Sequence, residues 1–293
     1  MEHGTVRKMG IPGRVAAVEG KGGLPKLEVT TDWCTGEVYL HGAHVTSFQK
    51  RGESPLLFLS KSSKFETGQP IRGGVPIVFP WFGPREGKPA HGFARTAAWE
   101  LREATATPDG GVSLRFQLGE YPADWPAHSL VFVVTFTDRL RMDLITTNLS
   151  DKPLSFENCL HTYLHVGEIG NVSVRGLKGL EYLDKTEYMA RKREPENNVR
   201  VSSEVDRIFL NTGETLEIQD TKLNRTLLVE KSGSASSVLW NPWSAKAKAL
   251  TDFGDEDYKQ MICVESGNVA DNRLALASGR SQILTTTLSS LPF

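Results

Sequence analysis

Short runs of apolar residues alternate with polar residues along most of the chain. From Leu27 onward these runs are rich in β-branched and aromatic residues, and each stops at Gly, Asp, Ser or Pro. They include LEVTT, EVYLHG, VSLRFQL, SLVFVVTFT, RMDLITTNLS, RTLLVE and RSQILTTTLSSL. No stretch longer than about twelve residues keeps a 3.6-residue period without a breaker, although DEDYKQMI near Asp255 is compatible with one or two helical turns. The pattern therefore predicts an all-β protein.

The domain organisation follows from chain length and from the spacing of the predicted strands. A length of 293 residues suggests two domains, but all-β sandwiches and barrels often exceed 200 residues as one domain. No internal repeat, low-complexity tract or linker divides the chain. We expect an irregular N-terminal extension over residues 1–24 and a single β-domain over residues 25–293. Residues 190–200 are predicted to form an exposed excursion between strands. The strand pattern alone does not separate a sandwich from a barrel.

Charge and cysteine content narrow the class of partner. The 34 Lys and Arg residues balance 35 Asp and Glu residues, and the formal net charge of -1 gives no basic field for nucleic acid. The first residues contain no apolar segment typical of a signal peptide, and no run is long enough to span a bilayer. Cys34, Cys159 and Cys263 form no CxxC pair, which fits a reducing compartment and argues against a zinc cluster. We expect a cytoplasmic protein with neither nucleic-acid nor membrane partners.

The segment from Ile71 to Arg95 is the densest in chemistry. It combines an apolar, aromatic run with glycines, prolines and five basic residues, namely Arg72, Arg85, Lys88, His91 and Arg95. Neither a helix nor a central strand tolerates so many glycines and prolines. Glycine lets backbone approach a ligand closely, and arginine offers a planar fork of donors that matches carboxylate or phosphate. The segment is either a loop that holds an anion or a surface loop with solvated charges. It lacks the GxxxxGK[ST] pattern of a phosphate loop.

A second informative segment, residues 155–166, is predicted to be one strand. Side chains alternate along a strand, so one face carries Phe156, Asn158, Leu160, Thr162, Leu164 and Val166, and the other carries Glu157, Cys159, His161, Tyr163 and His165. The second face suits a sugar cleft. Taken alone, His161 is a half-buried histidine satisfied by a neighbour, a metal ligand or an acid. A metal shared with His165 is disfavoured, because four strand residues span about 13 Å.

Three further features have both a structural and a functional interpretation. Glu265 follows the apolar residues 262–264 and is either a strand-end glutamate in water or a partly desolvated carboxyl with a raised pKa, suited to a general base. Asp206 in VDRIFLN is either a turn residue or a ligand contact. The aromatic residues of WNPW, Trp240 and Trp243, either pack the core or border a cleft.

Three separated segments together resemble one family. RGGVPIVFPWFGP followed by HGFAR, ENCLHTYLHVG at 157–167 and CVESGNV at 263–269 resemble the hexose-phosphate mutarotases, the glucose-6-phosphate 1-epimerases related to aldose 1-epimerase and to plant apospory-associated protein C. The segments occur in the family's order and span most of the chain. The resemblance implies a galactose-mutarotase-like β-sandwich, or supersandwich, with a substrate cleft on the concave face of a large sheet.

The resemblance also implies an activity and a set of residues. It identifies the reaction as interconversion of the α and β anomers of a hexose 6-phosphate, with glucose 6-phosphate foremost, by acid/base ring opening without cofactor or metal. The implied catalytic residues are His161 as acid and Glu265 as base, and the implied substrate-binding residues are Arg72, His91, Arg95 and Asp206. Arg72 and Arg95, with His91, are expected to hold the 6-phosphate, and Asp206 a sugar hydroxyl.

Two positions depart from the family pattern. Ala90 stands where some members have a polar residue, so one sugar contact is missing or replaced, and Arg85 and Lys88 receive no role. Other functions stay open: a mutarotase of unphosphorylated aldoses, a noncatalytic carbohydrate-binding module, and a glycoside hydrolase accessory domain with paired carboxylates. The sequence leaves the preferred hexose phosphate, the oligomeric state and any regulatory partner open.

Overall fold

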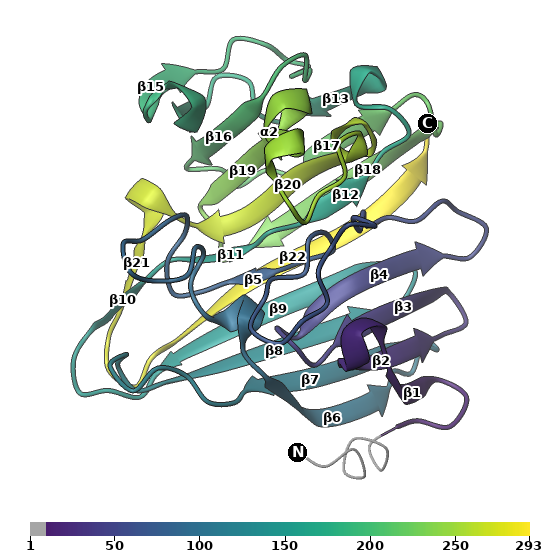
Figure 1. The fold of residues 1–293 in the computed structure, drawn as a ribbon, viewed down its shortest axis with the longest axis vertical. Coiled ribbons are helices and arrows are strands. Elements are labelled where there is room, and N and C mark those ends of the chain that lie inside the picture. Colours follow the sequence, from purple (N-terminus) through teal and green to yellow (C-terminus); the bar gives the residue numbers. More distant parts are fainter. Residues whose placement is uncertain (1–9) are drawn as a thin grey trace.

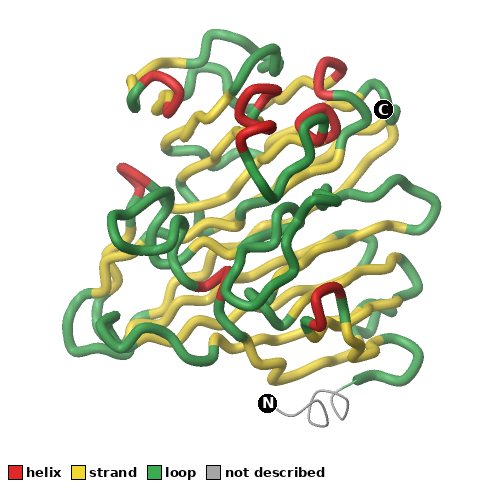
Figure 2. The backbone as a smooth tube through the Cα atoms, viewed as in Figure 1, coloured by secondary structure: helices red, strands yellow, loops and turns green. Residues whose placement is uncertain are grey.

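The computed structural model describes residues 10–293, and these form an almost entirely β-structure, which confirms the predicted all-β class (Figures 1 and 2). One antiparallel sheet of eight strands has the order β13 (Val172–Arg175), β17 (Leu216–Asp220), β18 (Arg225–Ser232), β22 (Ser281–Pro292), β9 (Leu140–Asn148), β8 (His128–Phe136), β7 (Val112–Leu118) and β6 (Trp99–Ala106). We call it the long sheet.

The other sheets lie against the long sheet. A second eight-stranded sheet, here the site sheet, has the order β15 (Ala190–Arg193), β14 (Glu181–Asp184), β16 (Val205–Leu210), β19 (Ser236–Asn241), β20 (Met261–Asn268), β11 (Asn158–Leu160) and β5 (Ile77–Val78), with β12 (Tyr163–His165) also paired to β20. A four-stranded sheet contains β1 (Val15–Glu19), β2 (Pro25–Thr30), β3 (Cys34–Tyr39) and β4 (His44–Lys50). A small sheet pairs β10 (Leu154–Phe156) with β21 (Leu274–Leu276).

Helical structure is limited to short segments. These are α2 (Trp243–Ala249) and the 3-10 turns η1 (Lys21–Gly23), η2 (Ala94–Thr96), η3 (Ile169–Asn171), η4 (Lys185–Glu187), η5 (Asp257–Gln260) and η6 (Ala270–Asn272). The turn η5 confirms the helical turn predicted near Asp255. None of the helices in residues 10–293 is long and apolar enough to cross a membrane.

The main core fills the space between the long sheet and the two sheets in front of it (Figure 1). Strand β8 shows how the sequence directs this packing, because Leu130, Phe132, Val134 and Phe136 alternate along it and are all buried. The Phe136 ring stacks on Phe48 of β4 at 6.2 Å, which joins the long sheet to the four-stranded sheet. Each fully buried side chain of this size stabilises the fold by about 1.5–3 kcal/mol.

The predicted single strand over residues 155–166 is wrong in detail, because the structure divides it into β10, β11 and β12. The segment runs beside residues 74–80, and His161 donates its backbone N–H to the Pro76 carbonyl at 3.0 Å. Glu157 does the same with Pro80 at 2.9 Å. Prolines accept hydrogen bonds but cannot donate them, so a regular two-way ladder is interrupted here. The pairing with β20 nevertheless keeps one register, from Leu160 opposite Ser266 to Tyr163 opposite Cys263.

The chain before residue 25 also differs from the expectation of an irregular extension. Strand β1 pairs antiparallel with β2, and Val15 is buried in the main core. The remaining part of this prediction, residues 1–9, lies outside the described residues. In the predicted excursion over residues 190–200, β15 forms a sheet edge and residues 195–198 are exposed. All three cysteines are free and buried.

Candidate active site

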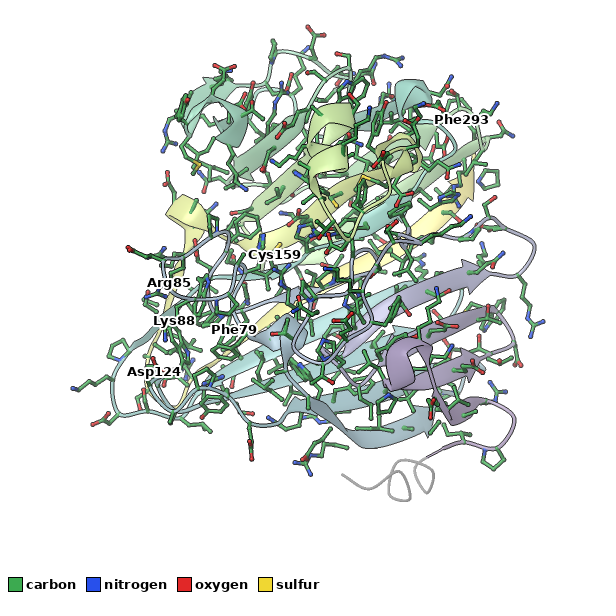
Figure 3. All side chains as sticks on the ribbon, in the orientation of Figure 1. Phe79, Arg85, Lys88, Asp124, Cys159 and Phe293 are labelled. Atoms are coloured by element: carbon green, nitrogen blue, oxygen red, sulfur yellow. The ribbon has the colours of Figure 1, made fainter. Side chains whose placement is uncertain are left out.

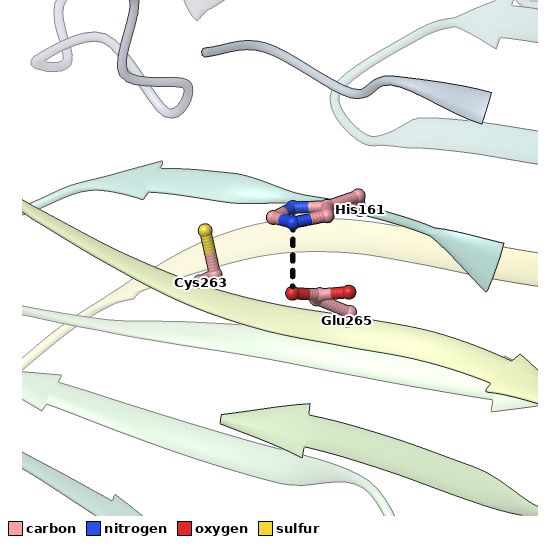
Figure 4. A group of neighbouring side chains, drawn as sticks. All are labelled: His161, Cys263 and Glu265. Carbon is pink, nitrogen blue, oxygen red and sulfur yellow. Dashed lines mark ion pairs between the residues drawn. The ribbon is translucent and has the colours of Figure 1, made fainter. Parts of the chain in front are cut away.

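His161 and Glu265 form a cross-strand pair on the site sheet. The register on either side of the break between β11 and β12 places His161 opposite Glu265 of β20. Side chains in directly opposed positions of antiparallel strands lie next to each other. His161 Nε2 is 3.2 Å from Glu265 Oε1, and the two residues are 7% and 1% exposed, respectively (Figure 4). The fold thus brings an imidazole and a carboxyl from two distant parts of the chain into contact, and both are almost fully buried.

Burial moves the proton affinities of the pair in opposite directions. Desolvation raises the pKa of Glu265 to about 8, with Asp206 adding to the rise and Lys185 opposing it. Desolvation lowers the pKa of His161 well below its usual value, and His91 and Arg95 lower it further. Because the two groups interact directly, they titrate as a pair. Near neutral pH the pair holds a proton on the carboxyl side and a neutral imidazole.

Neighbouring side chains fix the orientation of both members. The Tyr163 ring is stacked on the His161 ring at 4.8 Å with an interplanar angle of 13°, and the Trp240 ring meets His161 edge-on at 6.1 Å. Cys159 Sγ donates to Glu265 Oε2 at 3.4 Å, so the other carboxyl oxygen remains directed at the imidazole. His161 Nδ1 is buried and has no hydrogen-bond partner in the described part of the chain. The neighbouring side chains therefore fix the orientation of His161 and Glu265, and His161 Nδ1 has no hydrogen-bond partner among these residues.

Arg72 enters the site from the glycine-rich segment and is held at two points. Its Nε donates to Asp252 Oδ2 at 3.2 Å, one terminal nitrogen donates to Asp252 Oδ1 at 3.1 Å, and the other donates to the Tyr163 hydroxyl at 3.2 Å. Burial opposes the charge of Arg72, but Tyr163 and Asp252 offset it and hold its pKa above the usual value. The glycines are required because Gly74 has φ of +60°, and a Cβ there would lie 2.2 Å from the Val45 carbonyl oxygen.

Arg95 and His91 lie on the same side of the pair as Arg72. One terminal nitrogen of Arg95 donates to the Ala90 carbonyl at 2.7 Å, while its Nε is buried without a partner among residues 10–293. Desolvation lowers the pKa of Arg95 to about 10, so the group stays charged at neutral pH.

His91 presents a neutral ring to His161. It accepts from the Gly83 backbone N–H through Nδ1 at 3.3 Å, which leaves its other ring nitrogen as an N–H donor. The two histidine rings are 5.6 Å apart, and burial lowers the His91 pKa well below its usual value. His91 has a positive φ of 63°, a conformation that side chains other than glycine rarely adopt. Gly92 follows with φ of +75°, where a Cβ would lie 1.9 Å from the Phe79 carbonyl oxygen.

Asp206 lies on the opposite side of the pair, two strands away from β20. Asp206 is opposite Trp240 in the pairing of β16 with β19. Its Oδ2 forms an ion pair with Lys185 Nζ at a distance of 3.0 Å. Its Oδ1 is buried and unpartnered in the described residues. The ammonium of Lys185 also lies 5.1 Å from the centre of the Phe82 ring, and Phe82 in turn contacts His91 edge-on at 4.8 Å.

The six residues singled out from the sequence therefore surround one site, whereas Arg85 and Lys88 lie outside it. Arg85 stacks on the Trp81 ring at 4.9 Å, and Lys88 pairs with Asp124 at 2.8 Å; Figure 3 shows these charges at one edge of the molecule. Ala90 contributes its carbonyl to Arg95 rather than a side chain to the site. Of WNPW, only Trp240 borders the pair. A separate groove of 620 Å³, lined in part by Lys26 and Phe65, contains none of the predicted site residues.

Sequence reasoning missed Asp252, Lys185 and the role of Cys159. Asp252 follows no motif and reaches Arg72 across 180 positions of sequence. Lys185 lies on the exposed turn η4, where a lysine normally signifies only solubility. Cys159 was on the correct face of the predicted strand, but a thiol gives no signal of its contact. Alternation in a strand could have found Cys159 only if the register with β20 had been known.

The only group of donors suited to a metal in the described residues is made by His161, Cys263 and Glu265, whose ligand atoms lie within 4.8 Å of one another (Figure 4). Imidazole, thiolate and carboxylate are zinc ligands. The guanidinium groups of Arg72 and Arg95 act on this pair and oppose a further cation there. We therefore assign no metal to the site.

Comparisons with known proteins agree with this geometry. The profile of the family described as "Aldose 1-epimerase" matches residues 25–289. A protein of Cenchrus ciliaris named "Putative glucose-6-phosphate 1-epimerase" is 34% identical over 276 residues, covering 88% of this chain and 82% of the relative. A protein of Escherichia coli strain K12 with the same name is 35% identical over 239 residues, covering 80% of each chain.

Similarity to solved structures covers almost the whole chain. A crystal structure from Salmonella typhimurium, described as that of a "putative mutarotase", superimposes with a TM-score of 0.89 and 30% identity, covering 97% of this chain and 95% of the other. A galactose mutarotase-like protein from Clostridium acetobutylicum has a TM-score of 0.72 at 16% identity, and this similarity concerns the fold alone. The expected galactose-mutarotase-like β-sandwich is confirmed. This chain belongs to the aldose 1-epimerase family.

Proposed function

We propose that this protein interconverts the α and β anomers of a hexose 6-phosphate, with glucose 6-phosphate as the preferred substrate. The observation that carries the proposal is the buried His161–Glu265 contact of 3.2 Å, with Arg72, Arg95 and His91 on the His161 side. Strongly perturbed titratable groups in contact with each other are typical of proton-transfer sites.

The pair matches the chemistry of ring opening. A base removes the proton of the O1 hydroxyl while an acid protonates the ring oxygen O5, the C1–C2 bond rotates in the open aldehyde, and the steps reverse. O1 and O5 are bonded to the same carbon, so the base and the acid must be neighbours. In our proposal Glu265 serves O1 and His161 serves O5. Neither step needs a redox group, because no atom changes its oxidation state between the two anomers.

The phosphate group provides a reason why the reaction starts when the substrate binds. In the free protein the carboxyl side of the pair holds the proton, since the pKa of Glu265 is about 8. A phosphate dianion on the His161 side neutralises the arginines and favours a charged imidazolium. The proton then moves from Glu265 to His161, which produces the ionised base and the protonated acid together.

The basic side of the site favours a phosphosugar over a free aldose. Arg95 is partly buried with only one backbone carbonyl as hydrogen-bond partner in the described residues, and its buried Nε is unsatisfied there. A guanidinium in that state gains charge-assisted hydrogen bonds from a phosphate, and a free hydroxymethyl group would leave it unpaired. The noncatalytic alternative offers no reason for a carboxyl and an imidazole to be buried in contact.

Anomer exchange measured by NMR tests the proposal. We would follow saturation transfer between α and β glucose 6-phosphate, and between the anomers of glucose, with wild-type protein and with Glu265→Gln. Acceleration of glucose 6-phosphate well above glucose, lost in the variant, is the expected result. Exchange at the spontaneous rate with both sugars would make the protein a binding module, and equal acceleration of both would make it a general aldose mutarotase.

A further inference from the structure

Lys185 is a cation of the site to which the proton-transfer chemistry assigns no task. It lies at the start of the turn η4, and its side chain is 25% exposed, whereas its partner Asp206 is 9% exposed. The ammonium is 3.0 Å from Asp206 Oδ2 and 5.1 Å from the centre of the Phe82 ring. What distinguishes this ion pair is the second carboxyl oxygen, because Asp206 Oδ1 is buried and has no partner in the described residues. The pair therefore has an unused acceptor beside the site.

The order of strands in the site sheet separates two ends of the site. Across the sheet, Asp206 with Lys185 lies at β16, Glu265 lies at β20 and His161 follows the end of β11. Asp206 is opposite Trp240 of β19, and Glu265 is opposite Val238, two positions from Trp240 on the same face of that strand. Neighbouring strands are about 4.8 Å apart, so Asp206 lies roughly 10 Å from the strand of Glu265 along the sheet. Lys185 is the cation that most strongly opposes the raised pKa of Glu265, and it also lowers the pKa of His91, whereas the cations that lower the pKa of His161 are Arg95 and Arg72.

This order matches the order of groups around a pyranose 6-phosphate. The ring oxygen is bonded to C5, which carries the phosphorylated C6, and C1 is bonded on its other side to C2 with its hydroxyl. With His161 at O5 and Glu265 at O1, the phosphate falls at the arginine end and the C2 hydroxyl falls at the Lys185 end. We propose that Lys185 is a specificity-determining residue, whose ammonium donates a hydrogen bond to the C2 hydroxyl of the bound sugar phosphate.

The pairing with Asp206 explains why one hydroxyl suffices to satisfy both groups. A hydroxyl donates one hydrogen bond and accepts others, so it can accept from the Lys185 ammonium while donating to Asp206. Asp206 Oδ1 is the atom available for that bond, because it is buried and has no partner in the described part of the chain. A sugar without the hydroxyl leaves both charged groups without their ligand contacts. This inference rests on the proposed function for the position of the sugar.

The experiment compares glucose 6-phosphate with 2-deoxyglucose 6-phosphate. We would measure kcat/KM for anomer exchange, and the Kd by calorimetry, with wild type, Lys185→Met and Lys192→Met. Lys192 is a matched control because its Nζ is 3.1 Å from the nearly buried Asp184 on the same hairpin. Asp184 is opposite Arg207, one position along from Asp206, so this pair lies on the other face of the sheet.

The expected result is a loss that depends on the hydroxyl. Hydrogen bonds to charged groups imply that Lys185→Met lowers kcat/KM and affinity for glucose 6-phosphate about tenfold to a hundredfold. The same variant should change the values for the 2-deoxy sugar less than about threefold, and Lys192→Met should change neither sugar. The wild-type preference for the 2-hydroxyl sugar should therefore disappear in Lys185→Met.

Other outcomes overturn the inference. Equal losses on both sugar phosphates would make Lys185 a structural or general electrostatic group, and a loss seen with phosphosugars but not with glucose would make it a phosphate ligand. If Lys185→Met does not fold, the double variant with Asp206→Asn removes the unpaired carboxylate and must also lose the preference. A wild type that binds both sugar phosphates without accelerating exchange defeats the proposed function alone, because the binding preference still tests Lys185.

Discussion

Arg72 and Asp252 meet in a two-point ion pair, with nitrogen–oxygen distances of 3.2 and 3.1 Å. The third donor direction of the guanidinium is used by Tyr163, the residue stacked on His161. Arg72 is therefore preorganised and linked to the proposed acid, whereas Arg95 is partly buried and its Nε has no partner in the described residues. The two arginines should differ in what their removal does.

We expect Arg95→Ala to lower kcat/KM for glucose 6-phosphate about tenfold to a hundredfold and to leave glucose nearly unchanged, because only the phosphate uses its charge-assisted bonds. Arg72→Ala should lower the phosphosugar value by a similar factor and also affect glucose, since it leaves Asp252 unpaired and frees Tyr163. Steady-state anomer exchange with both sugars measures this. Arg85→Ala, which removes an exposed arginine of the same segment, is the control and should match wild type. Equal losses on both sugars in Arg95→Ala would place the phosphate elsewhere.

His161→Ala and Glu265→Gln should each reduce kcat about a hundredfold to ten-thousandfold, the usual contribution of a positioned acid or base. Both variants should fold, because the main core lies on the other face of the site sheet. Exchange NMR gives the rate, and circular dichroism with thermal melting confirms folding. A folded variant that exchanges anomers at the wild-type rate would remove that residue from the proton transfer.

The pH profile of kcat/KM should be bell-shaped, because the active pair carries one proton. The raised pKa of Glu265, about 8, predicts that activity falls above about pH 8 as the last proton leaves the pair. The lowered pKa of His161 predicts that activity falls only well below pH 6.5, when a second proton binds. This differs from the simple assignment of each limb to one residue, since the limbs belong to the pair.

Profiles with glucose remove the titration of the substrate phosphate, which lies near pH 6. A profile flat from pH 5 to about 9 would contradict a two-residue mechanism.

The free energy of unfolding should also depend on pH because of the buried Glu265 carboxyl. The pKa of Glu265 is raised in the folded protein from 4.5 to about 8, so the folded state holds a proton that the unfolded chain has released between these values. Its contribution is complete below about pH 4.5, declines by about 1.4 kcal/mol per pH unit and is lost as the pH rises through about 8. Glu265→Gln should therefore gain stability relative to wild type between pH 5 and 8. Urea unfolding of both proteins measures the difference, and a difference independent of pH would show that Glu265 is ionised when folded.

The all-β class follows from the hydrophobic pattern of the chain, and the sequence motifs indicated the residues around the site. Alternation placed Cys159, His161 and Tyr163 on one strand face, and the density of glycine with arginine selected residues 71–95. These features are local, because side-chain alternation and backbone freedom depend on neighbouring residues only. Prolines beside β11 and β12 broke the predicted strand, since their effect acts through the adjacent segment rather than along the chain.

The contacts between the site residues come from the folded arrangement of the strands and loops. The contact of His161 with Glu265, the hold of Asp252 on Arg72 and the pairing of Lys185 with Asp206 all depend on strand register and on loops that approach from elsewhere. The protonation of the pair is likewise a tertiary property, because burial and surrounding charge, not residue type, set the direction of each pKa shift. A carboxyl and an imidazole have ordinary proton affinities in the unfolded chain, and folding reverses their order by removing both from water.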